Sequence, residues 1–206
     1  GMLSQDILDA YWRAGFYVFE GAISQGEMHE IVSEYEALLE RIPSDSKSKT
    51  DAHGRPAVGL DYEHPPFRFA RPLSDPHGGT DSTNSRYPAK MSEPTPPSDA
   101  PEEVLLGIDG AFHYLESALR LYGHPQLLTI AEQINGADFT PFTDTIWVKP
   151  AGLGASVSWH QDGTTLWQDP AQDPGTHGFN FMTNFYRTNP ESALWVIPET
   201  HAIGKI

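Results

Sequence analysis

His160 and Asp162 are the residues whose types and spacing point most directly to chemistry. They follow an alternating segment, residues 155–159, and residues two apart in an extended strand point to the same face. An imidazole and a carboxylate therefore converge on one point. Such a pair forms two of the three ligands in the 2-His-1-carboxylate triad that holds non-haem Fe(II). The alternative is a His and an Asp that form local hydrogen bonds in a turn.

Composition limits the classes of function. The 206 residues are enough for one domain with a sizeable core. The net charge of −15 argues against sequence-independent nucleic-acid binding and against docking on anionic membranes. Because the chain has no Cys, any metal must be bound by His, Asp or Glu. No apolar run reaches membrane-spanning length and no signal peptide is recognisable, so a soluble, cytoplasmic protein is predicted.

The N-terminal region, residues 3–43, is predicted to form a helix, a short strand and a second helix. Ser4 is a suitable N-cap for the first helix, and Gly15 ends it. Residues 16–19 then form an aromatic, apolar run typical of a buried strand. Ser24 and Glu27 have the spacing of a capping box, which predicts an amphipathic helix ending near Pro43.

Residues 44–100 are rich in Pro, Ser, Asp and Gly and show no sustained period, which predicts a long loop or lid. Its cationic groups include Arg68, Arg71, Arg86 and Lys90. Two interpretations stay open for them. They are either solvated loop charges or part of a lid that offers a carboxylate-binding cation to a substrate.

Residues 101–136 carry apolar side chains at helical spacing, with a break near Gly110, a Pro125 suited to a first helical turn, and an end at Asn135-Gly136. Residues 139–206 favour strands, at 144–149, 155–159, 179–186 and 193–197. Helices followed by antiparallel strands indicate an α+β fold with a mainly β core.

Three segments, in order, carry a family resemblance: Tyr11 to Val18; Trp147-Val148-Lys149-Pro150 leading to Trp159-His160-Gln161-Asp162; and Ser192 to His201. With them the chain resembles the phytanoyl-CoA dioxygenase (PhyH-like) family of Fe(II)- and 2-oxoglutarate-dependent oxygenases. Ser192 and Glu199 replace glycines of the family pattern. The resemblance implies a single domain over residues 1–206, a double-stranded β-helix (jelly roll) with the N-terminal helices packed outside it.

The resemblance also implies a site. His160 and Asp162 would hold Fe(II), and 2-oxoglutarate would be the cosubstrate for hydroxylating a small organic substrate, with release of succinate and CO2. Gln161 matches the family residue between the ligands, which can reach the cosubstrate. Thr145 and Phe181 occupy positions where relatives contact 2-oxoglutarate and line the site. For these two residues, ordinary strand core is an equal alternative.

One part of the family pattern has no match. The second His ligand, and the Arg that pairs with the far carboxylate of 2-oxoglutarate, lie well beyond the His-x-Asp segment in the family, whereas this chain ends at residue 206. His201 and His177 are weak substitutes. The jelly roll is therefore expected to be incomplete at its C-terminal side, with open strand edges that a homo-oligomer would cover.

Two alternatives to an oxygenase follow from this mismatch. One is a truncated, non-catalytic relative that folds without turnover. The other is a cupin-type jelly roll that binds a small molecule through a different metal, with ligands drawn from His113, His124 or His177.

Overall fold

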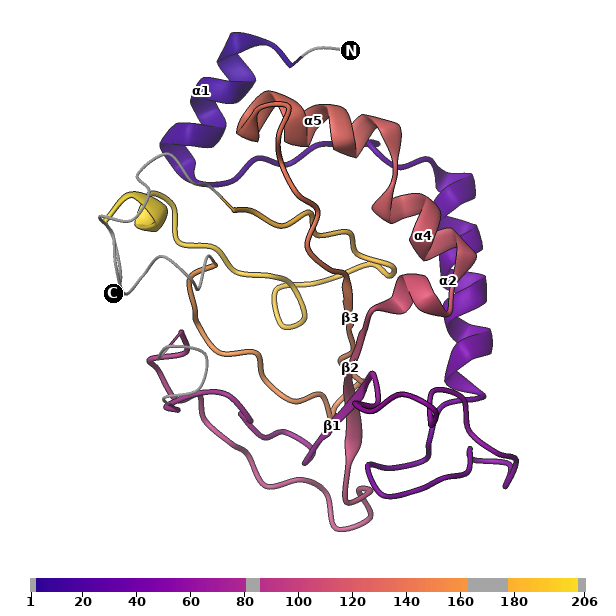
Figure 1. Ribbon diagram of the computed structural model, residues 1–206. Coiled ribbons are helices and arrows are strands. Elements are labelled where there is room, and N and C mark those ends of the chain that lie inside the picture. The colour runs from indigo at the N-terminus through magenta and orange to yellow at the C-terminus, as the bar shows by residue number, and fades with distance from the viewer. Residues whose placement is uncertain (1–2, 81–85, 163–177, 204–206) are drawn as a thin grey trace.

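The computed structural model describes residues 3–80, 86–162 and 178–203. Helices and one small sheet make up its regular structure (Figure 1). In chain order the elements are α1 (Gln5–Ala14), α2 (Gln25–Leu39), β1 (Phe67–Ala70), β2 (Val104–Asp109), η1 (Ala111–His113), α4 (Glu116–Tyr122), α5 (Pro125–Asn135), β3 (Thr145–Trp147) and η2 (Thr200–Ala202). The α+β class predicted from the sequence is confirmed.

The two N-terminal helices have the predicted caps. The side chain of Ser4 accepts from the backbone of Ile7, and α1 ends at Gly15 with a left-handed φ of 85°. At α2 the capping box between Ser24 and Glu27 is complete in both directions. The strand predicted at residues 16–19 is wrong: this segment has no strand partner.

The sheet has three antiparallel strands in the order β1-β2-β3. The prediction that Val104 to Asp109 is helical is wrong, because this segment is β2, the central strand. Its first five residues are all buried, and a continuous apolar run of this length is typical of a strand covered on both faces as well as of a buried helix. At Gly107 an added Cβ would lie 2.8 Å from the Arg68 guanidinium, so this glycine lets that side chain cross the strand.

The main core lies between α2, α4 and the sheet, and α2 and α4 lie side by side in Figure 1. Its buried members come from both helices, β1, β2, and η1 with the residue that precedes α4: Ile31, Tyr35, Leu38, Phe67, Leu105, Ile108, Ala111, Leu115 and Ala118. A smaller cluster joins Ala70, Leu106 and Ala155, with Trp147 against it. Through Ala155, this second cluster fixes the start of the segment that carries His160.

Residues 44–100 include β1 and otherwise follow an irregular path where they are described. Buried polar groups hold this loop: the side chains of Asp51 and Asp75 are 3% and 1% exposed. Both carboxylates accept backbone N–H groups of their own loop. Because buried charges need such partners, the two aspartates organise a stretch that has few apolar contacts.

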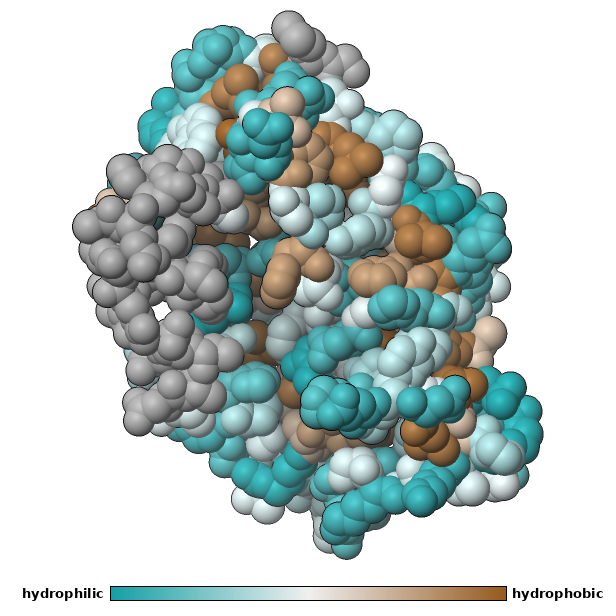
Figure 2. Space-filling model, viewed as in Figure 1, coloured by the Kyte–Doolittle hydropathy of each residue, from teal (hydrophilic) through white to brown (hydrophobic). Residues whose placement is uncertain are grey.

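The strands predicted at 155–159, 179–186 and 193–197 are not formed, since none of these segments is paired in a sheet. Several of their large side chains are exposed, among them Phe181, Leu194, Trp195 and Ile197. On the face shown in Figure 2, apolar residues lie in separate patches between hydrophilic ones. The described part of the chain therefore does not form a double-stranded β-helix. No helix within the described ranges is long and apolar enough to cross a membrane.

Candidate metal centre

The segment leading to His160 is held by the loop beside it rather than by a sheet. The backbone N–H of Leu73 donates to the carbonyl of Leu153 (3.0 Å), and that of Ser156 donates to the carbonyl of Ser74 (2.7 Å). The hydroxyl of Ser158, which is almost fully buried, donates to the carboxylate of Asp75. These bonds fix the segment although it lacks the ladder that the alternating sequence predicted.

His160 and Asp162 lie together, with His160 Nε2 3.5 Å from Asp162 Oδ1. The other ring nitrogen, Nδ1, lies 2.8 Å from the carbonyl oxygen of Ser158. Because a carbonyl only accepts, Nδ1 donates to it, and Nε2 is the ring nitrogen that lies beside Asp162. An N–H···O=C bond of this kind orients ligand imidazoles in metal sites.

This pair fits a divalent metal. Two ligand atoms that each lie about 2.1 Å from one ion can be at most about 4.2 Å apart. The observed 3.5 Å separation therefore allows both atoms to bind a single ion. An imidazole nitrogen and a carboxylate oxygen are also a donor set suited to iron.

Asp162 has two further partners. Arg86 Nη2 donates to Oδ1, and Asn180 Nδ2 donates to Oδ2 at 2.8 Å. The hydrogen bond with His160, assisted by the Arg86 charge and by Asn180, holds the pKa of Asp162 below its ordinary value against the opposing effect of burial. The carboxylate is therefore ionised at neutral pH, as a metal ligand must be.

Aromatic and imidazole rings pack beside His160. The ring of Tyr87 lies 4.9 Å from that of His160 and 5.1 Å from that of His77, with which it stacks. Burial, together with the charges of Arg68, His160 and Arg86, lowers the pKa of His77, although Asp75 opposes the shift. His77 is therefore expected to be neutral at physiological pH.

The three predicted cosubstrate contacts lie in different surroundings. Gln161 Nε2 donates to the carbonyl of Thr200 at 3.0 Å. Thr145 Oγ1 donates to Asp109 Oδ1 at 3.0 Å, on the carboxylate that also accepts from Arg68. The ring of Phe181 packs edge-on against Phe179 at 5.1 Å.

The structure brings no third ligand to the pair: among the described ranges, no three His, Asp or Glu side chains converge with metal-binding geometry. His201 Nε2 lies 2.8 Å from the carbonyl of Trp12 and so faces α1. His113 packs against Phe112, and His124 pairs with Glu27 at 3.2 Å. His177 lies outside the described residues.

Two neighbours of Asp162 were not predicted from the sequence. Asn180 was recognisable in part, since it lies on the opposite face from Phe179 and Phe181 in the alternating run. The sequence presents Arg86 only as one of several loop cations. It lies 76 positions from Asp162 in a region without periodicity, so no spacing rule links the two residues.

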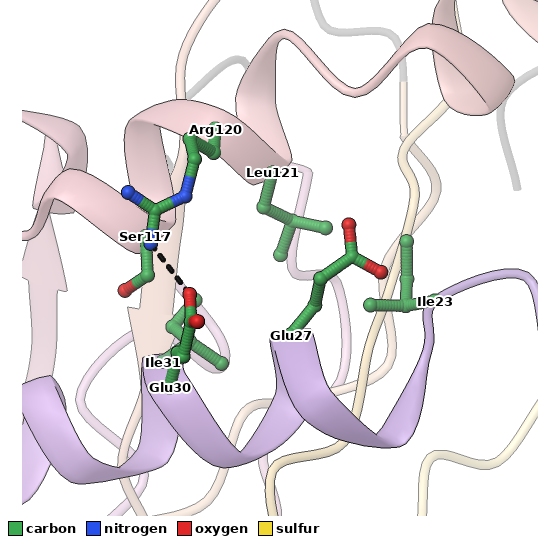
Figure 3. Close-up of a pocket in the computed structure, with 7 residues that line it drawn as sticks. All are labelled: Ile23, Glu27, Glu30, Ile31, Ser117, Arg120 and Leu121. Atoms are coloured by element: carbon green, nitrogen blue, oxygen red, sulfur yellow. Dashed lines mark hydrogen bonds and ion pairs between the residues drawn. The ribbon is translucent and has the colours of Figure 1, made fainter.

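A separate pocket lies between α2 and α4 (Figure 3). Ile23, Glu27, Glu30, Ile31, Ser117, Arg120 and Leu121 line it. Its volume of about 20 Å³ has room for about one water molecule, and Arg120 Nη2 crosses it to Glu30 at 2.6 Å. The pocket shares no residue with the His160 site and offers no space for a substrate.

His160, Asp162 and their neighbours define a candidate centre for a divalent metal with nitrogen and oxygen ligands. The chain belongs to the phytanoyl-CoA dioxygenase (PhyH) family, whose model matches residues 11–206. No match was found among curated proteins or among solved structures. Members of this family are, in general, oxygenases that depend on Fe(II) and 2-oxoglutarate.

Proposed function

We propose that this chain is a Fe(II)- and 2-oxoglutarate-dependent dioxygenase that hydroxylates a small organic substrate and releases succinate and CO2. The observation that carries the proposal is the position of His160 Nε2, 3.5 Å from an ionised Asp162 and with Nδ1 bonded to a backbone carbonyl. Family membership supplies the reaction class. Bound Fe(II) and 2-oxoglutarate would supply the oxidising power for inserting an oxygen atom into a C–H bond.

The protein's own residues prepare the ligand pair. Ser158 orients the imidazole through its carbonyl, and its hydroxyl is in turn held by the buried Asp75. Asn180 fixes the second oxygen of Asp162, so the first oxygen faces His160. Such supporting hydrogen bonds reduce the reorganisation that accompanies metal binding.

Gln161, Thr145 and Phe181 are proposed to contact the cosubstrate or line its site. The hydrogen bonds that now hold Gln161 to Thr200 and Thr145 to Asp109 would have to coexist with, or yield to, the cosubstrate. A complete jelly roll, as in the family, would require further strands. We propose that a second copy of the chain covers the open edges of the sheet, which light scattering on the purified protein would test by molecular mass.

The direct test is metal binding followed by turnover. Wild type, His160→Ala and Asp162→Ala would be titrated with Fe(II) under anaerobic conditions, and succinate formed from 2-oxoglutarate would then be measured in air. Both substitutions are expected to lower metal affinity strongly and to abolish succinate formation. His53→Ala is the matched control, because this imidazole pairs with Glu40 on the surface. Equal Fe(II) binding by wild type and His160→Ala would refute the proposal.

One observation favours a second candidate, a non-catalytic relative. Within the described ranges Asp162 is neutralised by Arg86, and no third ligand completes the site. A protein that binds Fe(II) and 2-oxoglutarate but forms no succinate with or without a panel of small substrates would support this alternative.

A further inference from the structure

One cationic side chain, Arg86, lies at the His160–Asp162 pair although the chain as a whole is acidic. Arg86 lies over the Tyr87 ring, 5.6 Å from its centroid, and His77 and His160 contact the same ring. The net charge of the chain is −15. A partly exposed guanidinium at this site offers an anion a positive charge within a chain that is acidic as a whole.

Arg86 has one donor without a partner among the described residues. Its side chain is 22% exposed, and its Nη2 donates to Asp162. Its Nε is buried and has no partner among the described residues. Leaving a buried donor unpaired costs free energy, and an Arg presents Nε and Nη in a planar fork that matches two carboxylate oxygens.

The oxygen that accepts from Arg86 is also the one that faces the candidate metal. Asp162 Oδ1 pairs with Arg86 and lies 3.5 Å from His160 Nε2. A divalent ion bound between the two ligands would compete with the guanidinium for this oxygen. The Arg86 side chain would then be free to turn toward another anion.

We infer that Arg86 is a carboxylate-binding residue of this site, held by Asp162 until a divalent metal takes that oxygen and then available to an organic carboxylate. The inference rests on the proposed metal site but concerns a residue outside the ligand set. Metal binding and carboxylate binding should then favour each other. The metal displaces Arg86 from Asp162, and the carboxylate holds Arg86 away from the oxygen that the metal binds. Thermodynamic linkage requires that the two effects be equal.

The test uses Mn²⁺ as the metal and glutarate, a dicarboxylate without a keto group, as the anion. Free Mn²⁺ would be measured by electron paramagnetic resonance, with and without glutarate, for wild type, Arg86→Ala and Arg86→Lys. Without anion, Arg86→Ala is expected to bind Mn²⁺ more tightly than wild type, which a merely damaged site would not do. Glutarate is expected to raise the Mn²⁺ affinity of wild type by about 5-fold or more, within the usual range of such couplings, and to have much less effect on Arg86→Ala.

Arg86→Lys keeps the positive charge but loses the planar pair of donors. The lysine is therefore expected to compete with Mn²⁺ for Asp162, while glutarate should raise the Mn²⁺ affinity of this variant less than that of wild type. Arg120→Ala is the matched control, since it removes the same charge from an ion-paired arginine between α2 and α4. Repeating the titration with 2-oxoglutarate separates the two sources of carboxylate. An Arg86-dependent gain with glutarate indicates that a carboxylate alone is recognised, as on an organic substrate, whereas a gain with 2-oxoglutarate alone assigns Arg86 to the cosubstrate.

Equal Mn²⁺ affinity and equal coupling in wild type and Arg86→Ala would overturn the inference and leave the proposed metal site intact. Absence of Mn²⁺ binding in both proteins would overturn the metal site and the inference together. Binding by Arg86→Ala alone would support the competition between Arg86 and the metal.

Discussion

Replacing Asp75 tests how strongly the loop of residues 71–93 is bound to the segment that carries His160. The side chain is 1% exposed. Its carboxylate accepts from Ser158 Oγ, from Gly78 N at 2.9 Å and from Met91 N at 2.6 Å. Burial alone would raise its pKa, but these hydrogen bonds outweigh burial and hold the pKa below its ordinary value. The folded state therefore contains a buried, ionised carboxylate with three donors.

The expected magnitudes follow from these three bonds. A hydrogen bond to a charged group contributes about 1.5–3 kcal/mol, and an unpaired buried donor costs about 1–3 kcal/mol. Asp75→Ala leaves three donors without the carboxylate, and water entering the space would satisfy some of them. We expect a loss of about 3–5 kcal/mol in the free energy of unfolding. Asp75→Asn should lose about 2–3 kcal/mol. The NH2 group of the new side chain cannot accept a hydrogen bond, so it would face one of the three donors that the carboxylate now satisfies.

Urea unfolding followed by tryptophan fluorescence would measure these losses by linear extrapolation. Ser158→Ala leaves the two backbone donors on Asp75, and the loss of one hydrogen bond to a charged group should cost about 1.5–3 kcal/mol. Combined with Asp75→Ala it should be clearly less than additive, because the two groups share a bond. Asp9→Ala, at an exposed position of α1, is the control. A loss of less than about 1 kcal/mol for Asp75→Ala, or strict additivity with Ser158→Ala, would refute this account.

Three further predictions concern stability. Ser24→Ala removes one half of the capping box of α2 and should cost about 1 kcal/mol in urea unfolding, whereas Ser24→Asp should restore most of it. Glu93 accepts hydrogen bonds from the Asp75 backbone, Lys90 and Arg71, which lowers its pKa from 4.5 to about 2. The contribution of the ionised Glu93 to the free energy of unfolding is therefore complete above pH 4.5 and is lost as the pH falls through about 2. The stability difference between wild type and Glu93→Gln should close over that interval, and a difference independent of pH would contradict it. Gly15→Ala places a Cβ at a left-handed φ and against the His201 ring, so it should lower the free energy of unfolding by more than about 1 kcal/mol. Adding His201→Ala to this variant should recover only the part of the loss that comes from the contact with the ring.

The features predicted well from the sequence are those that depend on neighbours in the chain. Ser24 and Glu27 are three residues apart, and the capping box that they predict is present. Pro125 opens α5 and Gly136 follows its end, as expected. Caps form from residues within one helical turn, so the identity of distant segments has little influence on them.

The errors lie where a segment needs a distant partner. The apolar run from Val104 is compatible with a buried helix or a buried strand, and its pairing with β1 and β3 decides between them. Residues 179–186 alternate as a strand should, but alternation describes the two faces of a strand and supplies no partner for its backbone. The described part of the chain offers these residues no ladder.

The candidate site combines both kinds of information. The side chains of His160 and Asp162, two residues apart in the sequence, meet although their segment is not part of a sheet. Arg86 reaches the same carboxylate from 76 positions away, through a loop whose path depends on buried groups such as Asp75. Two interpretations of the loop cations were therefore open in the sequence, solvated charge or carboxylate binder. The Arg86 guanidinium is bonded to Asp162, and its buried Nε has no partner among the described residues. This favours the second interpretation, because a solvated loop charge would have its donors in water.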